Sequence, residues 1–256
     1  MNTVQQKQFR VLLIGDTCCD VYQFGTVNRL SPEAPVPVFV QTDIKIAAGM
    51  ADNVKLNLEA LGCEVITMTG RTSVKTRLID TKSKQHIVRI DEDVASTPLQ
   101  FNDVPRDIDT HFDAVVISDY NKGYVTYDLI SQLRTKISLP IFIDTKKTDL
   151  SKFAGCYVKI NELEYSNSTS INDHLIVTLG DRGAMYKEMF NEWTYPAQQV
   201  GVTDVCGAGD TFLSAVTYKF LETDGNIGAA IEFAIKASAI TVQHLGNYAP
   251  TLKEIQ

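Results

Sequence analysis

The chain has 256 residues, which is enough for one large domain with a buried core. Hydrophobic residues make up 44% and charged residues 21%, values that are ordinary for a globular protein and exclude a disordered one. The formal net charge of −7 argues against a protein that wraps nucleic acid or lies on an anionic membrane. It does not exclude a phosphate ligand, because a few backbone amides and cations can bind one anion on an acidic protein.

No targeting or membrane segment is evident. The first residues are polar, and no apolar run approaches the roughly 20 residues that span a bilayer. The cysteines are scattered and lack C-x-x-C spacing, which is typical of reduced thiols. We therefore expect a cytoplasmic protein without a cysteine metal site. The cysteines are Cys18, Cys19, Cys63, Cys156 and Cys206.

Short apolar runs alternate with amphipathic segments along the chain. This alternation predicts an α/β domain whose mainly parallel sheet is covered by helices on both faces. The runs expected to form buried strands are 11–14, 65–68, 114–117, 141–143 and 175–178, and the expected helices are 51–61, 127–137, 208–221 and 227–244.

Two segments, about 20–45 and 75–91, depart from this rhythm. Their apolar and polar residues alternate between turn signals, a pattern typical of antiparallel strands with one solvated face. We expect them to form a small β-sheet lid over one end of a single domain, 1–256. Periodicity alone leaves open that they are simple surface hairpins.

The most informative stretch is TDVCGAGDTF at 203–212. Gly207, Ala208 and Gly209 can bring backbone N–H groups close to an anion, since no bulky side chain intervenes. The helix that follows adds a favourable potential for negative charge at its N-terminus. Asp210 would lie in the first turn, where a carboxylate can accept a proton from an attacking hydroxyl group.

Taken alone, this motif leaves open a tight loop in which Asp210 only completes the first helical turn. A dinucleotide-binding loop fits poorly, because Phe212 stands where a third glycine would be and the motif comes late in the chain. The sequence contains no G-x-x-x-x-G-K-[ST] motif, which excludes a P-loop.

TDVCGAGDTF resembles the C-terminal signature of the PfkB (ribokinase-like) carbohydrate kinases. Further collinear segments resemble the same family: GMADNVKLNLEALG, VISDYNKG, FIDTKK, the N-x-x-E pattern at 161–164, and VTLGDRG. The run SPEAPVPV is similar to the kinase domains that phosphorylate heptose 7-phosphate for lipopolysaccharide precursors. The resemblance implies a ribokinase-like three-layer fold with a β-sheet lid.

For the reaction, the resemblance implies that Asp210 is the catalytic base and that the amides of Gly207, Ala208 and Gly209 hold the transferring phosphoryl group. It further implies a set of acceptor-binding residues and a set that holds ATP and Mg²⁺. The acceptor set comprises Asp20, Gly49, Asn53, Asp119 and Lys122, with Asn121 nearby, and Asp16 is expected to be supportive. The nucleotide set comprises Asn161, Glu164, Lys146, Thr178 and Gly180, with adenine near 235–246 and Mg²⁺ organised by Glu164 through water.

Three features bear on the acceptor. Met50 and Asp52 depart from the family's glycine-rich loop, adding bulk and charge near the acceptor. The related kinases carry a further helix and strand where this chain passes almost directly from Gly70 to Val74, so we expect a trimmed sheet edge that is short or covered. In the lid, Arg77 and Arg89 are candidates to meet a sugar phosphate, although exposed strand arginines are often only solvated.

These observations predict a carbohydrate kinase that phosphorylates a sugar phosphate, heptose 7-phosphate-like at O1, and that pairs as a homodimer through the lid. A kinase for another sugar or a nucleoside, and a non-catalytic nucleotide- or sugar-binding homologue, remain the alternatives. The adenylyltransferase half of the bifunctional relatives is not expected within these residues.

Overall fold

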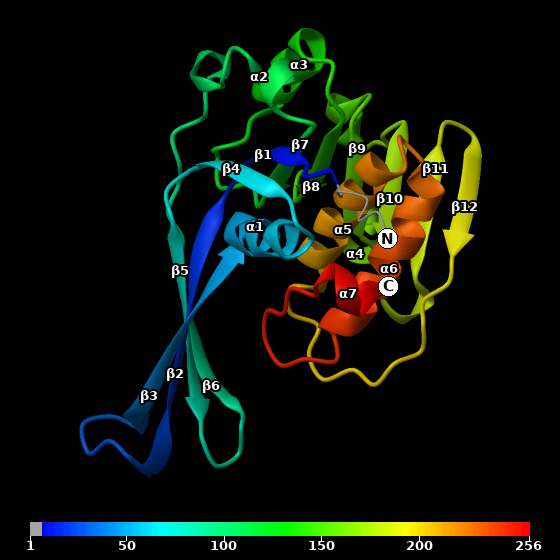
Figure 1. Cartoon of the computed structure of the whole chain (residues 1–256). Helices are drawn as coiled ribbons and strands as arrows, with labels where there is room; N and C mark the ends of the chain where they lie inside the picture. Colours follow the sequence, from blue (N-terminus) through cyan, green and yellow to red (C-terminus); the bar gives the residue numbers. More distant parts are fainter. Residues whose placement is uncertain (1–6) are drawn as a thin grey trace.

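The computed structural model describes residues 7–256, so the first six residues considered for a targeting signal lie outside it. Six parallel strands form most of the main sheet: β1 (Arg10–Gly15), β4 (Glu64–Thr69), β7 (Ala114–Asp119), β8 (Ile141–Thr145), β9 (Tyr157–Asn161) and β10 (His174–Thr178). The antiparallel strands β11 (Ala184–Glu188) and β12 (Asn191–Tyr195) extend one edge. The order is β12-β11-β10-β9-β8-β7-β1-β4 (Figure 1).

Helices cover both faces of this sheet. Along β1, Val11 and Leu13 pack in one core cluster while Leu12 and Ile14 pack in the other, because successive strand side chains point to opposite faces. The first cluster includes residues of α1 (Ala51–Ala60), α5 (Ala208–Glu222), α6 (Ile227–Thr241) and the short α7 (Leu252–Ile255). The second includes α2 (Ile108–His111) and α3 (Tyr127–Lys136), with α4 (Glu162–Ser166) and the 3-10 turns η1 (Phe101–Asp103), η2 (Leu150–Phe153) and η3 (Gly180–Arg182) in the connections.

The expected α/β fold with a mainly parallel sheet and a small second sheet is confirmed. The four predicted helices are α1, α3, α5 and α6, and their ends differ from the expected ones by three residues or fewer. The sequence analysis did not predict β9, β11 or β12. Their apolar runs are interrupted by polar residues such as Lys159 in β9 and Lys187 in β11.

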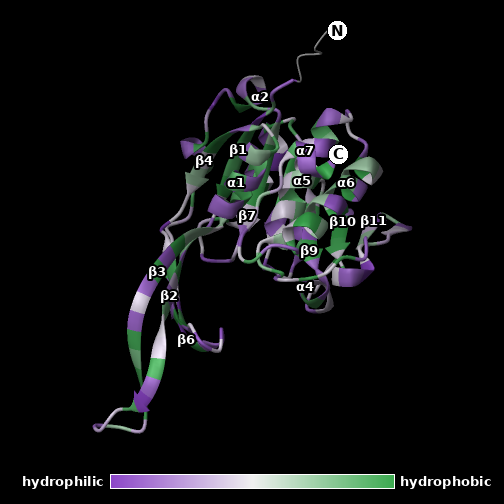
Figure 2. Cartoon of the chain, turned by 60° about the horizontal axis from the view of Figure 1, so that its bottom comes forward, coloured by the Kyte–Doolittle hydropathy of each residue, from purple (hydrophilic) through white to green (hydrophobic). Residues whose placement is uncertain are grey.

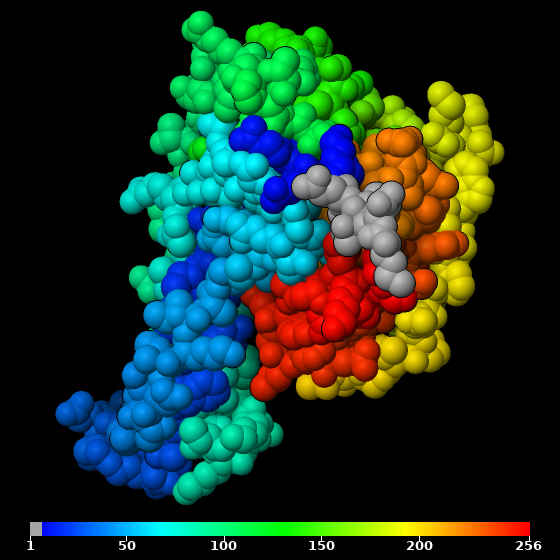
Figure 3. All heavy atoms as spheres, in the orientation of Figure 1, coloured from blue at the N-terminus to red at the C-terminus, as the bar shows by residue number. Residues whose placement is uncertain are grey.

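The second sheet contains the two segments expected to form a lid. Its strands are β2 (Thr17–Leu30), β3 (Pro37–Met50), β5 (Ser73–Asp80) and β6 (His86–Glu92), in the order β3-β2-β5-β6. Each hairpin is antiparallel as expected, but β2 pairs with β5 in parallel. Together the strands project from the rest of the molecule (Figure 3). We call this sheet the lid.

The lid has two chemically different faces. Strand register places Asp20, Lys75 and Asp91 in one row, and Lys45, Tyr22, Arg77 and Arg89 in the next row on the same face. The opposite face carries mainly apolar side chains, and its distal part is solvated. Those apolar residues are Val21, Ile44, Ile46, Leu78, Val88 and Ile90. The resulting alternation is visible along β3 (Figure 2).

The main sheet ends at β4, and residues 70–72 pass directly from β4 into β5 of the lid. This agrees with the trimmed edge that we expected. The edge strand is only six residues long, yet Ile66 remains 41% exposed, so β4 is short rather than covered. Within residues 7–256, no helix combines the length and apolar character needed to cross a membrane.

Candidate active site

Asp210 lies in the first turn of α5, where its side chain is only 7% exposed yet lines a cavity of about 530 Å³. Asn53 of α1 donates a hydrogen bond from Nδ2 to Asp210 Oδ2 across 2.7 Å. The hydroxyl of Tyr120 donates more weakly to Oδ1, at 3.4 Å. The structure thus brings together two residues predicted for catalysis and acceptor binding, and adds Tyr120, which sequence reasoning did not single out.

The backbone before Asp210 is open toward this cavity. Gly207 caps α5 with φ of 76°, a left-handed conformation that favours glycine, and a Cβ there would lie 2.9 Å from Asn53 Nδ2. Within the described residues, the amides of Gly207 and Gly209 donate to no backbone or side-chain acceptor, whereas Ala208 donates to Val205 O at 3.3 Å. Two of the three predicted amides are therefore free to bind an anion at the N-terminus of a 15-residue helix.

Burial raises the pKa of Asp210 to about 6, although the hydrogen bond from Asn53 lowers it. The carboxylate of Asp144 raises this pKa further, while Lys159 and Lys146 lower it. A carboxylate with such a pKa is ionised at neutral pH but binds a proton more readily than an exposed aspartate. These are the properties of a general base.

A buried ion pair lies beneath the free amides. Lys159 Nζ of β9 is 2.8 Å from Asp144 Oδ2 of β8, and a Cβ on Gly209 would lie 2.8 Å from that Nζ. Both side chains line the same cavity as Asp210, and Asp144 Oδ1 has no hydrogen-bond partner among the described residues. Sequence reasoning missed both residues, although Asp144 directly follows a predicted strand.

Lys146, which the sequence analysis assigned to the nucleotide, also lines this cavity. Its Nζ pairs with Glu164 and lies 5.2 Å from the centre of the Tyr120 ring. Burial alone would lower the pKa of Lys146, but Asp144 and Glu164 outweigh it and the pKa is raised. This lysine therefore remains a cation.

Asn161 and Glu164 form a capping box at the start of α4. The Asn161 side chain accepts from the Glu164 amide, and Glu164 Oε2 accepts from the Asn161 amide, both at 2.8 Å. The other oxygen of Glu164 bonds to Lys146. Asn161 lines the cavity but Glu164 does not, so Glu164 is connected to the cavity through its contacts with Lys146 and Asn161.

A second cavity, of about 250 Å³, adjoins the first. Thr178, Gly180 and Gly209 line both cavities, so an apolar compartment continues into the polar one. The apolar compartment lies where we expected adenine, against the last turns of α6. Its lining includes Phe212, Ile235, Ser238, Ala239 and Val242.

The predicted acceptor residues of the lid lie close together. Arg77 Nη1 is 2.5 Å from Asp20 Oδ1, and both side chains are largely buried. A Cβ on Gly49 would lie 2.4 Å from Asp20 Oδ2, so this close approach requires glycine. Arg89 lies farther out and pairs with Asp91 at 2.5 Å.

The end of β7 and the loop after it carry Asp119 and Lys122, which we expected to bind the acceptor. In the structure both side chains pair with other residues of the protein. Both oxygens of Asp119 bond to Lys147 Nζ, at 2.8 and 2.6 Å, and one also accepts from Thr145, so its buried carboxylate is used inside the protein. Lys122 pairs with Asp93 at 2.5 Å. Neither contact points to the acceptor.

The supporting role expected of Asp16 agrees with its contacts. Its Oδ2 accepts from the amides of Tyr120 and Lys122, at 2.8 and 3.2 Å. Asn121, the neighbouring residue in this loop, donates its amide to Asp119 at 2.9 Å. Asp16 and Asp119 therefore position the loop that carries Tyr120.

Met50 occupies a strained backbone position directly before α1. Its φ of 57° and ψ of −130° fall in a region that is essentially reserved for glycine, and its side chain is only 4% exposed. Asp52, the other departure noted in the sequence, is not among the residues that line the cavity of Asp210.

A family model described as "pfkB family carbohydrate kinase" matches residues 159–254, which include Lys159, Asn161 and Asp210. The bifunctional protein HldE of Helicobacter pylori (strain J99 / ATCC 700824) is 31% identical over 304 residues, covering 96% of this chain and 65% of that protein. Over residues 159–254 the chain matches the pfkB family of carbohydrate kinases, and its HldE relatives align with nearly the whole chain. The family model describes carbohydrate kinases, which are phosphotransferases with an alcohol group as acceptor.

Another HldE, from a Nitratiruptor species, is 30% identical over 302 residues, covering 96% of this chain and 64% of that protein. The chain thus spans less than two thirds of the length of these pfkB relatives. The alignment is longer than the 256-residue chain, so the relative contains segments that this chain lacks.

Solved structures share the fold at low identity. Ribokinase from Thermotoga maritima superposes with a TM-score of 0.73 at 15% identity, covering 96% of this chain and 98% of that one. Ribokinase from Arabidopsis thaliana complexed with ribose and ATP gives 0.73 at 13% identity, covering 97% and 98%. Phosphofructokinase-2 from Escherichia coli gives 0.72 at 16% identity, covering 97% of each chain.

Proposed function

We propose that this pfkB kinase transfers the γ-phosphoryl group of ATP to a hydroxyl group of a sugar phosphate, heptose 7-phosphate-like and at O1. One observation supports this most strongly. The Asp210 carboxylate and the free amides of Gly207 and Gly209 face one cavity, which continues into an apolar compartment suited to a purine. A nucleotide in that compartment would direct its terminal phosphate toward Asp210.

The residues divide the chemistry between them. As the acceptor oxygen forms its bond to the γ-phosphorus, Asp210 takes the hydroxyl proton, and the bond from that phosphorus to the bridging oxygen of ADP breaks. The amides of Gly207 and Gly209 and the ammonium of Lys159 hold the charge of the phosphoryl oxygens. Asn53 keeps the base oriented through its 2.7 Å hydrogen bond.

Mg²⁺ would supply charge neutralisation at the phosphates, and it prefers carboxylate, phosphate and water oxygens. Asp144 fits this need, because it lines the cavity and its buried Oδ1 has no hydrogen-bond partner among the described residues. Glu164, the residue that the sequence suggested, has both oxygens engaged by Asn161 and Lys146, so any role would be indirect. Within residues 7–256, no three His, Cys, Asp or Glu side chains are grouped as a metal site.

On the acceptor side, Asp20, Gly49 and Asn53 lie along one path from the lid to Asp210. We propose that Asp20 accepts hydrogen bonds from sugar hydroxyl groups. The heptose assignment rests on the resemblance of SPEAPVPV to heptose kinases. A different sugar or a nucleoside is the second candidate, because the buried Met50 takes the place of a small residue beside Gly49.

We further propose that two copies pair through the apolar face of the lid, since Ile46 is 65% exposed there and most of its neighbours on that face are apolar. A location in the cytoplasm is proposed from the five free thiols.

The decisive experiment measures ADP release from ATP and Mg²⁺ with heptose 7-phosphate, fructose 6-phosphate, ribose 5-phosphate, the unphosphorylated sugars and adenosine. We expect a heptose phosphate to be the best acceptor, and Asp210→Asn to lower turnover by roughly 100- to 10,000-fold while ATP still binds. Release that is unchanged in Asp210→Asn would refute the role of the base. Absence of release with every acceptor would favour a binding protein.

A further inference from the structure

Both oxygens of the Asp210 carboxylate accept hydrogen bonds from side chains of the protein. Oδ2 accepts from Asn53 Nδ2 at 2.7 Å, and Oδ1 accepts from the Tyr120 hydroxyl at 3.4 Å. The contact with Asn53 is short and buried, whereas the contact with Tyr120 is long and only partly buried. An incoming hydroxyl group therefore reaches the base most easily at Oδ1, where it must replace Tyr120.

The rest of Tyr120 is held firmly, although its hydroxyl contact is weak. Its backbone amide donates to Asp16 Oδ2 at 2.8 Å. Two ammonium groups lie near its ring, that of Lys146 at 5.2 Å and that of Lys75 at 5.8 Å from the ring centre. At such distances a cation is attracted to an aromatic ring. The hydroxyl thus stays beside Asp210 because the backbone and the ring are fixed, and not because its own bond is strong.

The Tyr120 hydroxyl acts toward the base only as a donor. Burial raises the pKa of Tyr120 well above its ordinary value, and the charges of Asp210 and Asp144 raise it further, so the hydroxyl stays protonated at neutral pH. Tyr120 lines the same cavity as Asp210 and as the glycines whose free amides would hold the phosphoryl group, Gly207 and Gly209. The hydroxyl therefore lies where a water molecule would have to approach the base to attack that group.

We propose that the Tyr120 hydroxyl shields the base from water, so that ATP is not hydrolysed while no acceptor is bound. This inference rests on the proposed kinase function and deepens it. In hydrolysis a water oxygen would bond to the γ-phosphorus, Asp210 would take one proton of that water, and the bond from the phosphorus to the bridging oxygen of ADP would break. The proton transfer is hindered while Tyr120 occupies Oδ1.

A sugar can displace this hydroxyl more readily than water can. It makes contacts remote from its reacting hydroxyl group, such as those proposed for Asp20, and their free energy can offset the lost bond between Tyr120 and Asp210. A water molecule has only the hydrogen bonds that it forms at the base itself. Because the displaced bond is 3.4 Å long, a bound sugar can break it at small cost. Tyr120 is therefore a residue that distinguishes a sugar hydroxyl from water.

Tyr120→Phe tests the shield, because it keeps the ring and removes only the hydroxyl. ADP release from ATP and Mg²⁺ without any acceptor should rise roughly 3- to 10-fold. At limiting acceptor the variant should form less than one phosphorylated sugar per ADP released, whereas the wild type should form one. Tyr124→Phe is the matched control, since Tyr124 lies in the same loop but packs against the core and does not line the cavity of Asp210. It should behave as the wild type.

The double variant Tyr120→Phe/Asp210→Asn separates a lost shield from a loosened structure. If the added hydrolysis passes through the base, the double variant should release no more ADP than Asp210→Asn alone. A rise that persists in the double variant, or that appears equally in Tyr124→Phe, would overturn the shield.

The same measurements distinguish this inference from the proposed function. Sugar-dependent ADP release by the wild type, together with no rise in Tyr120→Phe, would overturn the shield and leave the kinase proposal intact. A rise that requires Asp210, without turnover of any sugar, would support the shield and contradict the proposed acceptors. No ADP release by any of these proteins would overturn both.

Discussion

Asn53 and Asp210 are 157 positions apart, yet the amide nitrogen of one lies 2.7 Å from the carboxylate of the other. Two further polar contacts fasten their helices together. Thr211 donates to Asn57 at 2.8 Å and Ser214 donates to the Val54 carbonyl at 3.1 Å. The base is therefore held by α1, the helix that leads directly from the lid.

We predict that the pH dependence of kcat/KM has an acid limb near pH 6, because the base must be ionised and burial raises its pKa to about 6. Asn53→Ala removes the hydrogen bond that favours the carboxylate, so the limb should move to higher pH. Asn57→Ala is the control, since Asn57 lies one turn later in α1 and its side chain bonds to Asn53 O and Thr211 rather than to the base. An identical shift in both variants would contradict this assignment.

Asp210→Asn should stabilise the protein at neutral pH. The folded-state pKa of about 6 lies above the ordinary value of 3.8, so ionising Asp210 costs stability as pH rises from about 4 through 6. The gain in unfolding free energy should reach at most about 3 kcal/mol above pH 7 and vanish below pH 4. Urea unfolding at pH 3.5 and 7.5 measures this gain in unfolding free energy. A variant less stable than the wild type at pH 7.5 would contradict the claim that the buried Asp210 carboxylate costs stability.

Lys159→Gln should lower the free energy of unfolding by about 3–5 kcal/mol, because it leaves the Asp144 carboxylate buried without its partner. The double variant Lys159→Gln/Asp144→Asn removes the stranded charge and should recover much of that stability. It should not recover turnover, since the cation beside the phosphoryl group is still missing and the carboxylate proposed to hold Mg²⁺ is removed as well. If the double variant were no more stable than Lys159→Gln alone, loss of the ion pair would not be the cause of the lowered free energy of unfolding.

Met50 offers a test of backbone strain. Met50→Ala keeps the unfavourable φ of 57° and loses the buried side chain, whereas Met50→Gly loses the same side chain but relieves the strain. The glycine variant should therefore be more stable than the alanine variant by about 1 kcal/mol or more, the reverse of the usual order of these residues. Thermal unfolding of both proteins decides between them.

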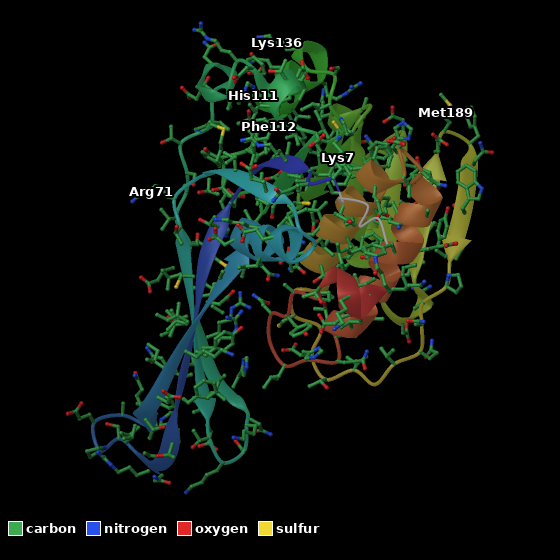
Figure 4. The ribbon with its side chains drawn as sticks, in the orientation of Figure 1. Lys7, Arg71, His111, Phe112, Lys136 and Met189 are labelled. Atoms are coloured by element: carbon green, nitrogen blue, oxygen red, sulfur yellow. The ribbon has the colours of Figure 1, made fainter. Side chains whose placement is uncertain are left out.

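We expect light scattering to report a dimer at micromolar concentration, and Ile46→Lys combined with Ile90→Lys to convert it to a monomer. The control is Phe190→Lys, on the hairpin between β11 and β12 next to Met189, at the opposite edge of the main sheet from the lid (Figure 4). A monomeric wild type, or a dimer that tolerates both lid lysines, would refute pairing through the apolar face.

The catalytic motif was predictable from sequence because it is local. Gly207, Gly209 and Asp210 are consecutive or nearly so, and one helix N-terminus orients them all. The Lys159–Asp144 pair was not predictable in the same way, since it depends on β8 and β9 being neighbours in a register that sets these two residues opposite each other. Lys159 also interrupts the apolar run of its strand, so the sequence pattern did not predict β9 as a strand.

The lid shows the same limit of prediction from local sequence patterns. Alternation within each segment predicted the hairpins, but the parallel pairing of β2 with β5 depends on the two hairpins meeting in space. Asp119 illustrates a related limit of sequence-based prediction. The resemblance placed it in the acceptor set, but a sequence does not show that Thr145 of the neighbouring strand β8 and Lys147, two residues later, bond to its carboxylate oxygens.

Only Asp16 separates β1 of the core from β2 of the lid, and its carboxylate holds the amides on both sides of Asn121. A rotation of the lid about this residue would also move the loop that carries Tyr120. Because the Tyr120 hydroxyl bonds to Asp210, the same rotation would shift the base. Closing over an acceptor and aligning the proton-accepting group would then be one movement rather than two.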